Sequence, residues 1–227
     1  MLLTLFGSDP WINLKDYTPF VLITFGIGCL LWAVVYVIVI RDIIKTKKID
    51  IPNAAICCNF AWEIYWGLFY HTNMGRLFEW AYFIWFFLDM FIVYSMFKYG
   101  ASQAITPGTK KLHVPAMAII LTMWLVIFYF EIPQYDDPVG ALSGWIVNVY
   151  MSVLFCYLKI RTPEFGLNRW VAVGKFLGTG FCTSVVFVNL YANKTLVALC
   201  FIFAAFDLIY IYLVFTGPKA SDVHASN

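Results

Sequence analysis

Three carboxylates interrupt apolar stretches of this chain. Glu63, Asp89 and Asp207 each lie inside a segment long enough to cross a membrane. A carboxylate at bilayer depth costs about 2.5 to 3.5 kcal/mol on insertion scales, so it persists only where a partner, a cavity or a reaction compensates. A carboxyl group can also deliver a proton as a general acid or accept one as a base. The sequence therefore predicts that these acids mark the functional site.

Helical spacing places suitable side chains beside the first acid. Asn59, Glu63 and Trp66 share one helix face, so Asn59 can hydrogen-bond the Glu63 carboxyl group and Trp66 can supply an aromatic wall. At about 1.5 Å of rise per residue, Glu63 lies about 15 Å from the start of its segment at Asn53, near the bilayer midplane. A dry aromatic pocket favours the neutral carboxylic acid, and electron-rich ring faces stabilise cations. This face suits a site that generates and holds a carbocation.

The other two acids lie at a similar depth. Asp89 and Asp207 each stand eight residues before the end of their segments, which is about 12 Å of helix. The three acids can therefore share one cavity with Glu63 in its wall. Asp89 has two alternative partners, Lys175 and Tyr94. For all three acids the alternative to catalysis is a structural role, in which hydrogen bonds to Asn and Tyr join neighbouring helices.

The composition is typical of a membrane protein. Of 227 residues, 62% are hydrophobic and 12% are charged, whereas a soluble domain is about half apolar and a quarter charged. Short connections leave no room for a second domain, so we predict one all-α domain over residues 1–227, an integral membrane bundle of seven transmembrane helices. Each segment has the roughly 17 to 25 residues that a span requires. The predicted spans are about 20–40, 53–70, 77–97, 114–130, 139–158, 171–191 and 195–215.

Lys and Arg are distributed unevenly between the loops. Most of them follow the first, third and fifth spans, whereas the opposite side has only Lys15, Arg76 and Lys194. Loops rich in Lys and Arg stay in the cytoplasm. We therefore predict a multi-pass protein with its N-terminus outside and its C-terminus in the cytoplasm. The membrane would be the endoplasmic reticulum in a eukaryote and the cytoplasmic membrane in a bacterium.

Four motifs resemble a known family. Cys57-Cys58-Asn59-Phe60-Ala61-Trp62-Glu63 is similar to the signature of the small membrane-bound terpene cyclases of meroterpenoid and indole-terpenoid biosynthesis (pyripyropene cyclase-like). Phe97-Lys98-Tyr99, Lys175-Phe176-Leu177-Gly178-Thr179 and Asp207-Leu208-Ile209-Tyr210 resemble further elements of that family and occur in the family's order. The similarity covers nearly the whole chain.

The resemblance implies an enzyme that needs no metal. Such enzymes protonate an epoxidised farnesyl or geranylgeranyl chain attached to an aromatic or polyketide group, and Glu63 and Asp207 match the two essential acids. Asp89 stands where the family has a neutral amide, so the resemblance assigns it no role. The loop before the last span is shorter than in the fungal enzymes, which leaves the substrate class open.

The sequence lacks the residues that nucleotide-binding and metal-binding sites require. No Gly-rich phosphate loop is present, and the three histidines do not cluster, so we expect neither a nucleotide nor a metal. Asp136-Asp137 lacks the third Asp of the Mg²⁺-binding motif in soluble terpene synthases, because position 140 is Gly. The six cysteines fall within apolar stretches without metal-like spacing.

Two functions stay open at this point. In the first, a membrane-bound terpene cyclase, Glu63 is the general acid that protonates an epoxide oxygen or a terminal alkene. Asp207 then either positions or reprotonates Glu63, or takes the final proton. The alternative is a proton-coupled seven-helix transporter or a lipid-binding membrane protein, in which the same acids mark a permeation path.

The predicted site follows from these motifs. Glu63 and Asp207 are the expected catalytic residues. The expected partners are a hydrophobic, prenylated and epoxidised small molecule and the lipid bilayer, with no cofactor, nucleic acid or obligate protein partner. The expected substrate-binding residues are Asn59, Trp62, Tyr65, Trp66, Asp89, Trp145, Asn148, Lys175 and Tyr210.

Overall fold

The computed structural model describes residues 10–104, 106–163, 165, 168–190 and 193–217, and this part of the chain forms helices and connecting turns without strands. Most helices are α-helical; η2 and η4 are π-helical and η3 is a 3₁₀ turn. In chain order the elements are α1 (Pro19–Thr46), α2 (Asn53–Ile64), η2 (Tyr65–Phe69), α3 (Arg76–Tyr99), η3 (Gly100–Gln103), α4 (Pro107–Lys111), α5 (His113–Tyr135), α6 (Ala141–Arg161), α7 (Arg169–Lys175), η4 (Phe176–Thr183), α8 (Ser184–Leu190) and α9 (Lys194–Thr216).

Six helical stretches of the described chain are long and apolar enough to cross a membrane. They coincide with six of the seven predicted spans and confirm a multi-pass membrane protein. The predicted span 53–70 is helical as well, but it consists of 12 residues in α2 and five in η2. This stretch is shorter than the others, so the seventh span is not confirmed. Residue 191, the predicted end of the sixth span, lies outside the described residues.

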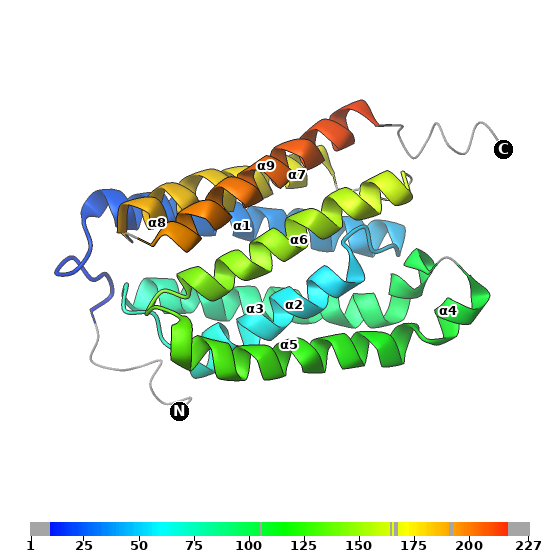
Figure 1. The fold of residues 1–227 in the computed structure, drawn as a ribbon, viewed down its shortest axis with the longest axis horizontal. Helices are drawn as coiled ribbons and strands as arrows, with labels where there is room; N and C mark the ends of the chain where they lie inside the picture. Colours follow the sequence, from blue (N-terminus) through cyan, green and yellow to red (C-terminus); the bar gives the residue numbers. More distant parts are fainter. Residues whose placement is uncertain (1–9, 105, 164, 166–167, 191–192, 218–227) are drawn as a thin grey trace.

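Successive long helices alternate in direction along the bundle. In Figure 1, α1, α3, α6 and α9 run one way, while α2, α5 and the α7–α8 stretch return. Lys45, Lys98 and Arg161 lie in the last turns of α1, α3 and α6, so these charges gather at one end of the bundle. The assignment of that end to the cytoplasm stays a prediction.

The helix that contains Glu63 lies inside the bundle. α2 packs against α3, α5 and α6. Ala55, Cys57, Cys58 and Ala61 are fully buried, and small side chains of this kind let neighbouring helices approach closely. The acid is thus placed in the interior by the small residues that precede it.

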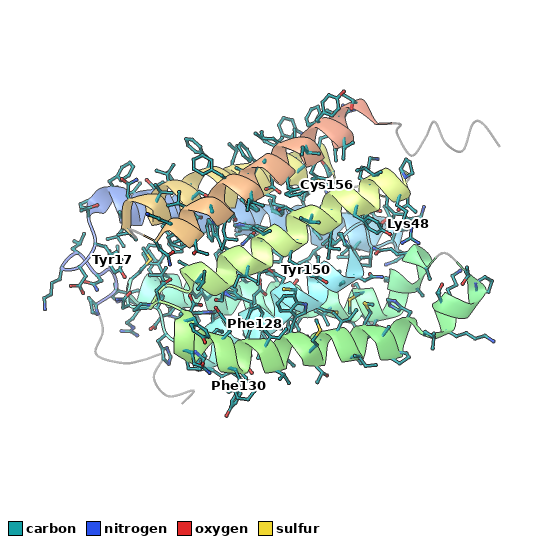
Figure 2. All side chains as sticks on the ribbon, viewed as in Figure 1. Tyr17, Lys48, Phe128, Phe130, Tyr150 and Cys156 are labelled. Carbon is teal, nitrogen blue, oxygen red and sulfur yellow. The ribbon has the colours of Figure 1, made fainter. Side chains whose placement is uncertain are left out.

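The outer faces of the helices are apolar. On α5, Phe128 is buried between helices, whereas Phe130 points away from the bundle and is 57% exposed (Figure 2). Exposed Ile119, Val126 and Tyr129 continue this surface along α5. A contiguous apolar surface of this kind is costly in water and suits contact with lipid.

Side chains cap the first turns of α1 and α9. The Thr18 hydroxyl accepts a hydrogen bond from the Val21 amide and precedes Pro19, which is preorganised for the first turn of α1. Asn193 similarly accepts from the backbone amides of Thr195 (2.9 Å) and Leu196 (3.3 Å) at the start of α9. These contacts satisfy amides that a helix leaves unpaired at its N-terminus.

Two π-helical segments lie next to Glu63 and Lys175. η2 begins two residues after Glu63, and η4 begins directly after Lys175. In η4 the Thr183 hydroxyl donates to the Gly178 carbonyl at 2.8 Å, and a side chain at Gly28 of α1 would come within 2.8 Å of the same carbonyl. Glycines therefore bring α1 and η4 into contact. The sequence predicted regular helices here, because apolar periodicity does not reveal a π-turn, a feature that is frequent at functional sites.

Candidate active site

A cavity lies among α1, α2, α3, α6 and the η4–α8 stretch. It encloses about 610 Å³, counting the space at its mouth. Its polar lining comes from Asn59, Glu63, Asn148, Thr179 and Thr183, so one carboxyl group stands with a few amides and hydroxyls in a largely aromatic wall. The aromatic residues of the wall are Phe25, Trp32, Tyr36, Trp62, Tyr82, Trp85, Trp145 and Phe187.

Glu63, which lines this cavity, has one carboxyl oxygen bound by neighbouring side chains and one without a hydrogen-bond partner in the described part of the chain. The side chain is 2% exposed. The Tyr36 hydroxyl donates to its Oε1, and Asn59 Nδ2 donates to the same atom at 2.9 Å, so the predicted Asn59–Glu63 hydrogen bond is present. Oε2 has no hydrogen-bond partner among the described residues. The carboxyl group is thus oriented through one oxygen, while the other is buried and has no partner among them, on a side chain that lines the cavity.

Asp89 joins the same polar cluster through the amide of Asn59. Asn59 Nδ2 lies 3.3 Å from Asp89 Oδ2 and 2.9 Å from the Tyr36 hydroxyl. Neither predicted partner pairs with Asp89. Tyr94 is 60% exposed, since five residues of helix turn it to the opposite face. Lys175 pairs with another acid.

Lys175 forms a buried ion pair with Asp207. Lys175 Nζ lies 2.5 Å from Asp207 Oδ1 and 2.6 Å from the Ser152 hydroxyl, which itself donates to Asp207 at 2.7 Å. Lys175 and Asp207 are both buried, and the lysine cation lies 4.3 Å from the ring centre of Phe203. The ion pair joins α7 to α9, and Ser152 connects it to α6. No hydrogen bond or ion pair of the described residues joins Asp207 to Glu63.

The three acids do not share one cavity. Glu63 lines the main cavity, whereas Asp89 and Lys175 line a second one, and Asp207 lines neither. Asn59 lines both cavities, and so do Trp32 and Tyr36 of α1. The depth of a residue along its helix follows from sequence, but the direction in which its side chain points depends on how the helix is rotated against its neighbours.

Four predicted substrate-binding residues, Asn59, Trp62, Trp145 and Asn148, line the main cavity. Three others do not line either cavity. The Tyr65 hydroxyl donates to the Leu125 carbonyl of α5, Trp66 packs against Trp62 and Tyr82, and Tyr210 packs against Phe155. The π-helical turn begins at Tyr65, so the regular spacing used to place Trp66 on the same face as Glu63 ends there.

Trp32 and Tyr36 of α1 were not among the predicted site residues. They are four residues apart, so they project from one face of α1, and both line the main cavity. Trp32 Nε1 donates to the Thr179 hydroxyl of η4, while the Tyr36 hydroxyl reaches Glu63. Their spacing of four residues within a mostly aliphatic span is the signal that could have identified them.

The loop between α5 and α6 borders the cavity. Asp136 and Asp137 accept hydrogen bonds from the backbone amides of Leu142 and Ala141, each at 3.0 Å, so these acids hold the start of α6. Burial raises the pKa of Asp136 from its usual 3.8 to about 6; the hydrogen bond from Ser143 opposes this rise and the Asp137 carboxylate adds to it. In the part of the chain that the structure describes, no three His, Cys, Asp or Glu side chains gather as metal ligands.

We expect Gly140→Ala to destabilise this loop. Gly140 has φ = 75°, and an added Cβ would lie 2.6 Å from Cε2 of Trp66. Left-handed backbone and overpacking together should cost about 2 to 4 kcal/mol. Thermal unfolding in detergent should show a clearly lower midpoint than wild type. Gly108→Ala is the control, because its nearest neighbour would be 3.9 Å away; equal midpoints for both variants would contradict this prediction.

Comparisons with known proteins place this chain in a family. The sequence profile of the Pyr4-like transmembrane terpene cyclases matches residues 13–217. The chain is 26% identical over 192 residues to terpene cyclase ascF of Acremonium egyptiacum, covering 77% of this chain and 70% of that protein. It is 26% identical over 175 residues to the Pyr4-family terpene cyclase mfmH of Annulohypoxylon moriforme, covering 72% and 68%. Identity to terpene cyclase spyD of Aspergillus fumigatus is 25% over 166 residues, covering 67% and 70%. No solved structure matches significantly.

The matched region contains Glu63, Asp89 and Asp207 and all the helices described above. These matches favour the enzyme over the transporter or lipid-binding protein that the sequence left open. They also confirm the resemblance seen in the four sequence motifs. The chain belongs to the Pyr4-like transmembrane terpene cyclases.

Proposed function

We propose that the protein cyclises the prenyl chain of a hydrophobic substrate and that Glu63 starts the reaction by donating a proton. The observation that carries this proposal is the state of the Glu63 carboxyl group. Tyr36 and Asn59 hold one of its oxygens, and the other, without a partner, belongs to a side chain in the wall of an aromatic cavity. A positioned general acid contributes about 10²- to 10⁴-fold in rate.

The chemistry requires no external electron donor or acceptor. Glu63 transfers its proton to an epoxide oxygen, the C–O bond opens to an alcohol and a carbocation, and the π electrons of the next alkene attack the cation to close a ring. With a terminal alkene the proton goes to carbon instead. Loss of a proton at the end regenerates an alkene, so the product is an isomer of the substrate. Nearby ring faces stabilise the cations.

Two neighbours of Glu63 support the proton transfer. When Glu63 loses its proton, the Tyr36 hydroxyl and the Asn59 amide donate to the carboxylate that forms. Donors placed in advance around a developing charge stabilise a transition state without reorganisation. Trp62, Trp145 and Asn148 would contact the folded prenyl chain, since they line the cavity.

The substrate class that we propose is an epoxidised farnesyl or geranylgeranyl chain on an aromatic or polyketide group. The family and the aromatic lining support a terpenoid chain, and the cavity suits an apolar guest. The reaction would proceed without a metal, in the membrane, with the N-terminus outside and the C-terminus in the cytoplasm.

For Asp207 we propose that it positions the cavity wall, a role that differs from the positioning of Glu63 suggested by the sequence. Asp207 is bound by Lys175 and Ser152, and the Ser152 hydroxyl also lies 2.8 Å from the backbone carbonyl of Asn148, a residue of the cavity wall. The ion pair would thus hold the wall through α6. Asp89 would orient Asn59, which in turn orients Glu63.

A turnover assay tests the proposed function. Membranes containing the protein are incubated with epoxyfarnesylated and epoxygeranylgeranylated aromatic compounds, and products of unchanged mass are separated by chromatography. We expect a cyclic isomer from the wild type. A folded wild-type protein that converts none of these substrates would contradict the proposed substrate class.

We expect Tyr36→Phe to lower turnover about 10- to 100-fold. A hydrogen bond to a charged group is worth about 1.5 to 3 kcal/mol, and the variant removes the hydroxyl that donates to Glu63. The measurement is turnover at saturating substrate. Tyr17→Phe is the control, because the Tyr17 hydroxyl donates to Asn73, away from the cavity. Similar turnover in both variants would show that Tyr36 does not assist Glu63.

A further inference from the structure

Three side chains connect a surface loop to the cavity wall. Trp62 Nε1 donates to the Ser143 hydroxyl at 2.8 Å, and Ser143 donates to Asp136 Oδ2. Trp62 lines the main cavity, Ser143 is fully buried, and Asp136 lies in the loop between α5 and α6. An acid outside the long helices is therefore linked to a ring that faces the substrate.

Other contacts fix both ends of this hydrogen-bonded series, Asp136 at one end and Trp62 at the other. Asp136 Oδ1 accepts from the backbone amides of Asp137 and Leu142, each at 3.0 Å, which anchors the carboxyl group to the start of α6. At the other end, the Trp62 ring lies 5.5 Å from the ring of Tyr82, in an edge-on contact. A Cβ added at Gly144 would lie 3.5 Å from the same indole, so the position is close-packed on the α6 side. The hydrogen bond to Ser143 then selects which edge of the indole faces α6.

We propose that Asp136 and Ser143 are positioning residues that set the orientation of the Trp62 ring and thereby the products of cyclisation. The second half of this statement rests on the proposed function. A ring face stabilises a cation only where the cation lies over it. A rotated indole would stabilise positive charge at a different carbon, so deprotonation would occur earlier and partly cyclised products would accumulate.

The protonation state of Asp136 affects the hydrogen bond between Trp62 and Ser143. Above its pKa of about 6, the Asp136 carboxylate only accepts, and Ser143 donates to it while accepting from Trp62. Below that pH the carboxylic acid can donate to Ser143 and compete with the indole. The neighbouring carboxyl group that raises the pKa of Asp136 is that of Asp137, and Glu131 on α5 also interacts electrostatically with these two loop acids.

The first experiment observes the indole directly. The protein is labelled with ¹⁵N at its tryptophans, and the Trp62 signal is identified by its loss in Trp62→Phe. We expect the indole N–H proton signal to move upfield in Ser143→Ala. In the wild type it should shift as pH falls through about 6, and this shift should be missing in Asp136→Asn. A Trp62 signal that stays in place in both Ser143→Ala and Asp136→Asn overturns the proposal, whether or not the protein is a cyclase.

The second experiment measures products in a double-mutant cycle. Ser143→Ala should raise the fraction of partly cyclised products about twofold to tenfold, the range that one neutral hydrogen bond supports. In the Trp62→Phe background the same substitution should have no further effect, because the indole donor is already missing. If the effects of Ser143→Ala and Trp62→Phe on the products are additive, Ser143 acts only on the fold of α6. That result would overturn the proposal that Ser143 controls the products through Trp62. A wild-type protein that cyclises none of the substrates contradicts the proposed function instead. The Trp62 indole signal then still tests whether Asp136 and Ser143 orient the ring.

Discussion

Glu63→Gln should abolish cyclisation while leaving the fold and substrate binding intact. The amide keeps the size of the side chain and can still accept hydrogen bonds from Tyr36 and Asn59, but it has no acidic proton to transfer. Turnover should fall at least about 10²- to 10⁴-fold, the contribution of a placed general acid. The loss should appear in kcat, with KM nearly unchanged, because the lost interaction is made in the transition state.

The measurement compares single-turnover conversion and substrate binding in detergent-solubilised protein. Glu131→Gln is the matched control, because Glu131 is an acid within α5, a helix long and apolar enough to cross a membrane, and does not line the cavity. Wild-type turnover in Glu63→Gln would show that the proton comes from another group. Loss of binding together with turnover would indicate that Glu63 contributes chiefly to holding the substrate.

Asp207→Asn should destabilise the protein by about 3 to 5 kcal/mol, the cost of breaking a buried ion pair from one side. Lys175 is 2% exposed, and its ammonium group would lose the carboxylate that lies 2.5 Å away. Thermal unfolding in detergent should show a large fall in the midpoint. The combined variant Lys175→Met with Asp207→Asn should recover much of this loss, because it leaves no buried charge without a partner.

The same two variants separate a positioning role from a catalytic one. If Asp207 acts by holding the cavity wall, the combined variant should regain part of the turnover as it regains stability. A combined variant that is stable but inactive would contradict the positioning role, and would return Asp207 to the alternative in which it takes the final proton. Lys175→Met alone should be unstable, since it leaves the Asp207 carboxylate buried without its cation.

Much of the architecture is determined locally. The lengths and composition of the apolar segments predict the long helices, because a membrane-crossing backbone must satisfy its own hydrogen bonds within one segment. The pairing of Asn59 with Glu63 is also local, since residues four apart meet on any α-helix. Both predictions depend on the backbone of one helix alone.

The partners of each acid across helices depend on tertiary structure. Tyr36 comes from α1 to meet Glu63, and Lys175 comes from α7 to meet Asp207 rather than Asp89. Neither pairing follows from spacing, because the rotation of one helix against another is determined by packing along its whole length. The π-turns add to this difficulty, since one extra residue per turn redirects every side chain near it.

The sequence by itself determined that three acids lie within apolar helices, that one has an amide partner on its own helix face, and that these motifs resemble a family of membrane cyclases. Only the tertiary structure decided that Glu63 faces an aromatic cavity, that Asp207 is held in an ion pair outside it, and that Ser143 links Asp136 to Trp62. The physical reason is that hydrogen bonds within a helix are made between near neighbours in the chain, whereas the contacts that complete a site join residues as far apart as 147 positions, as Trp32 and Thr179 are.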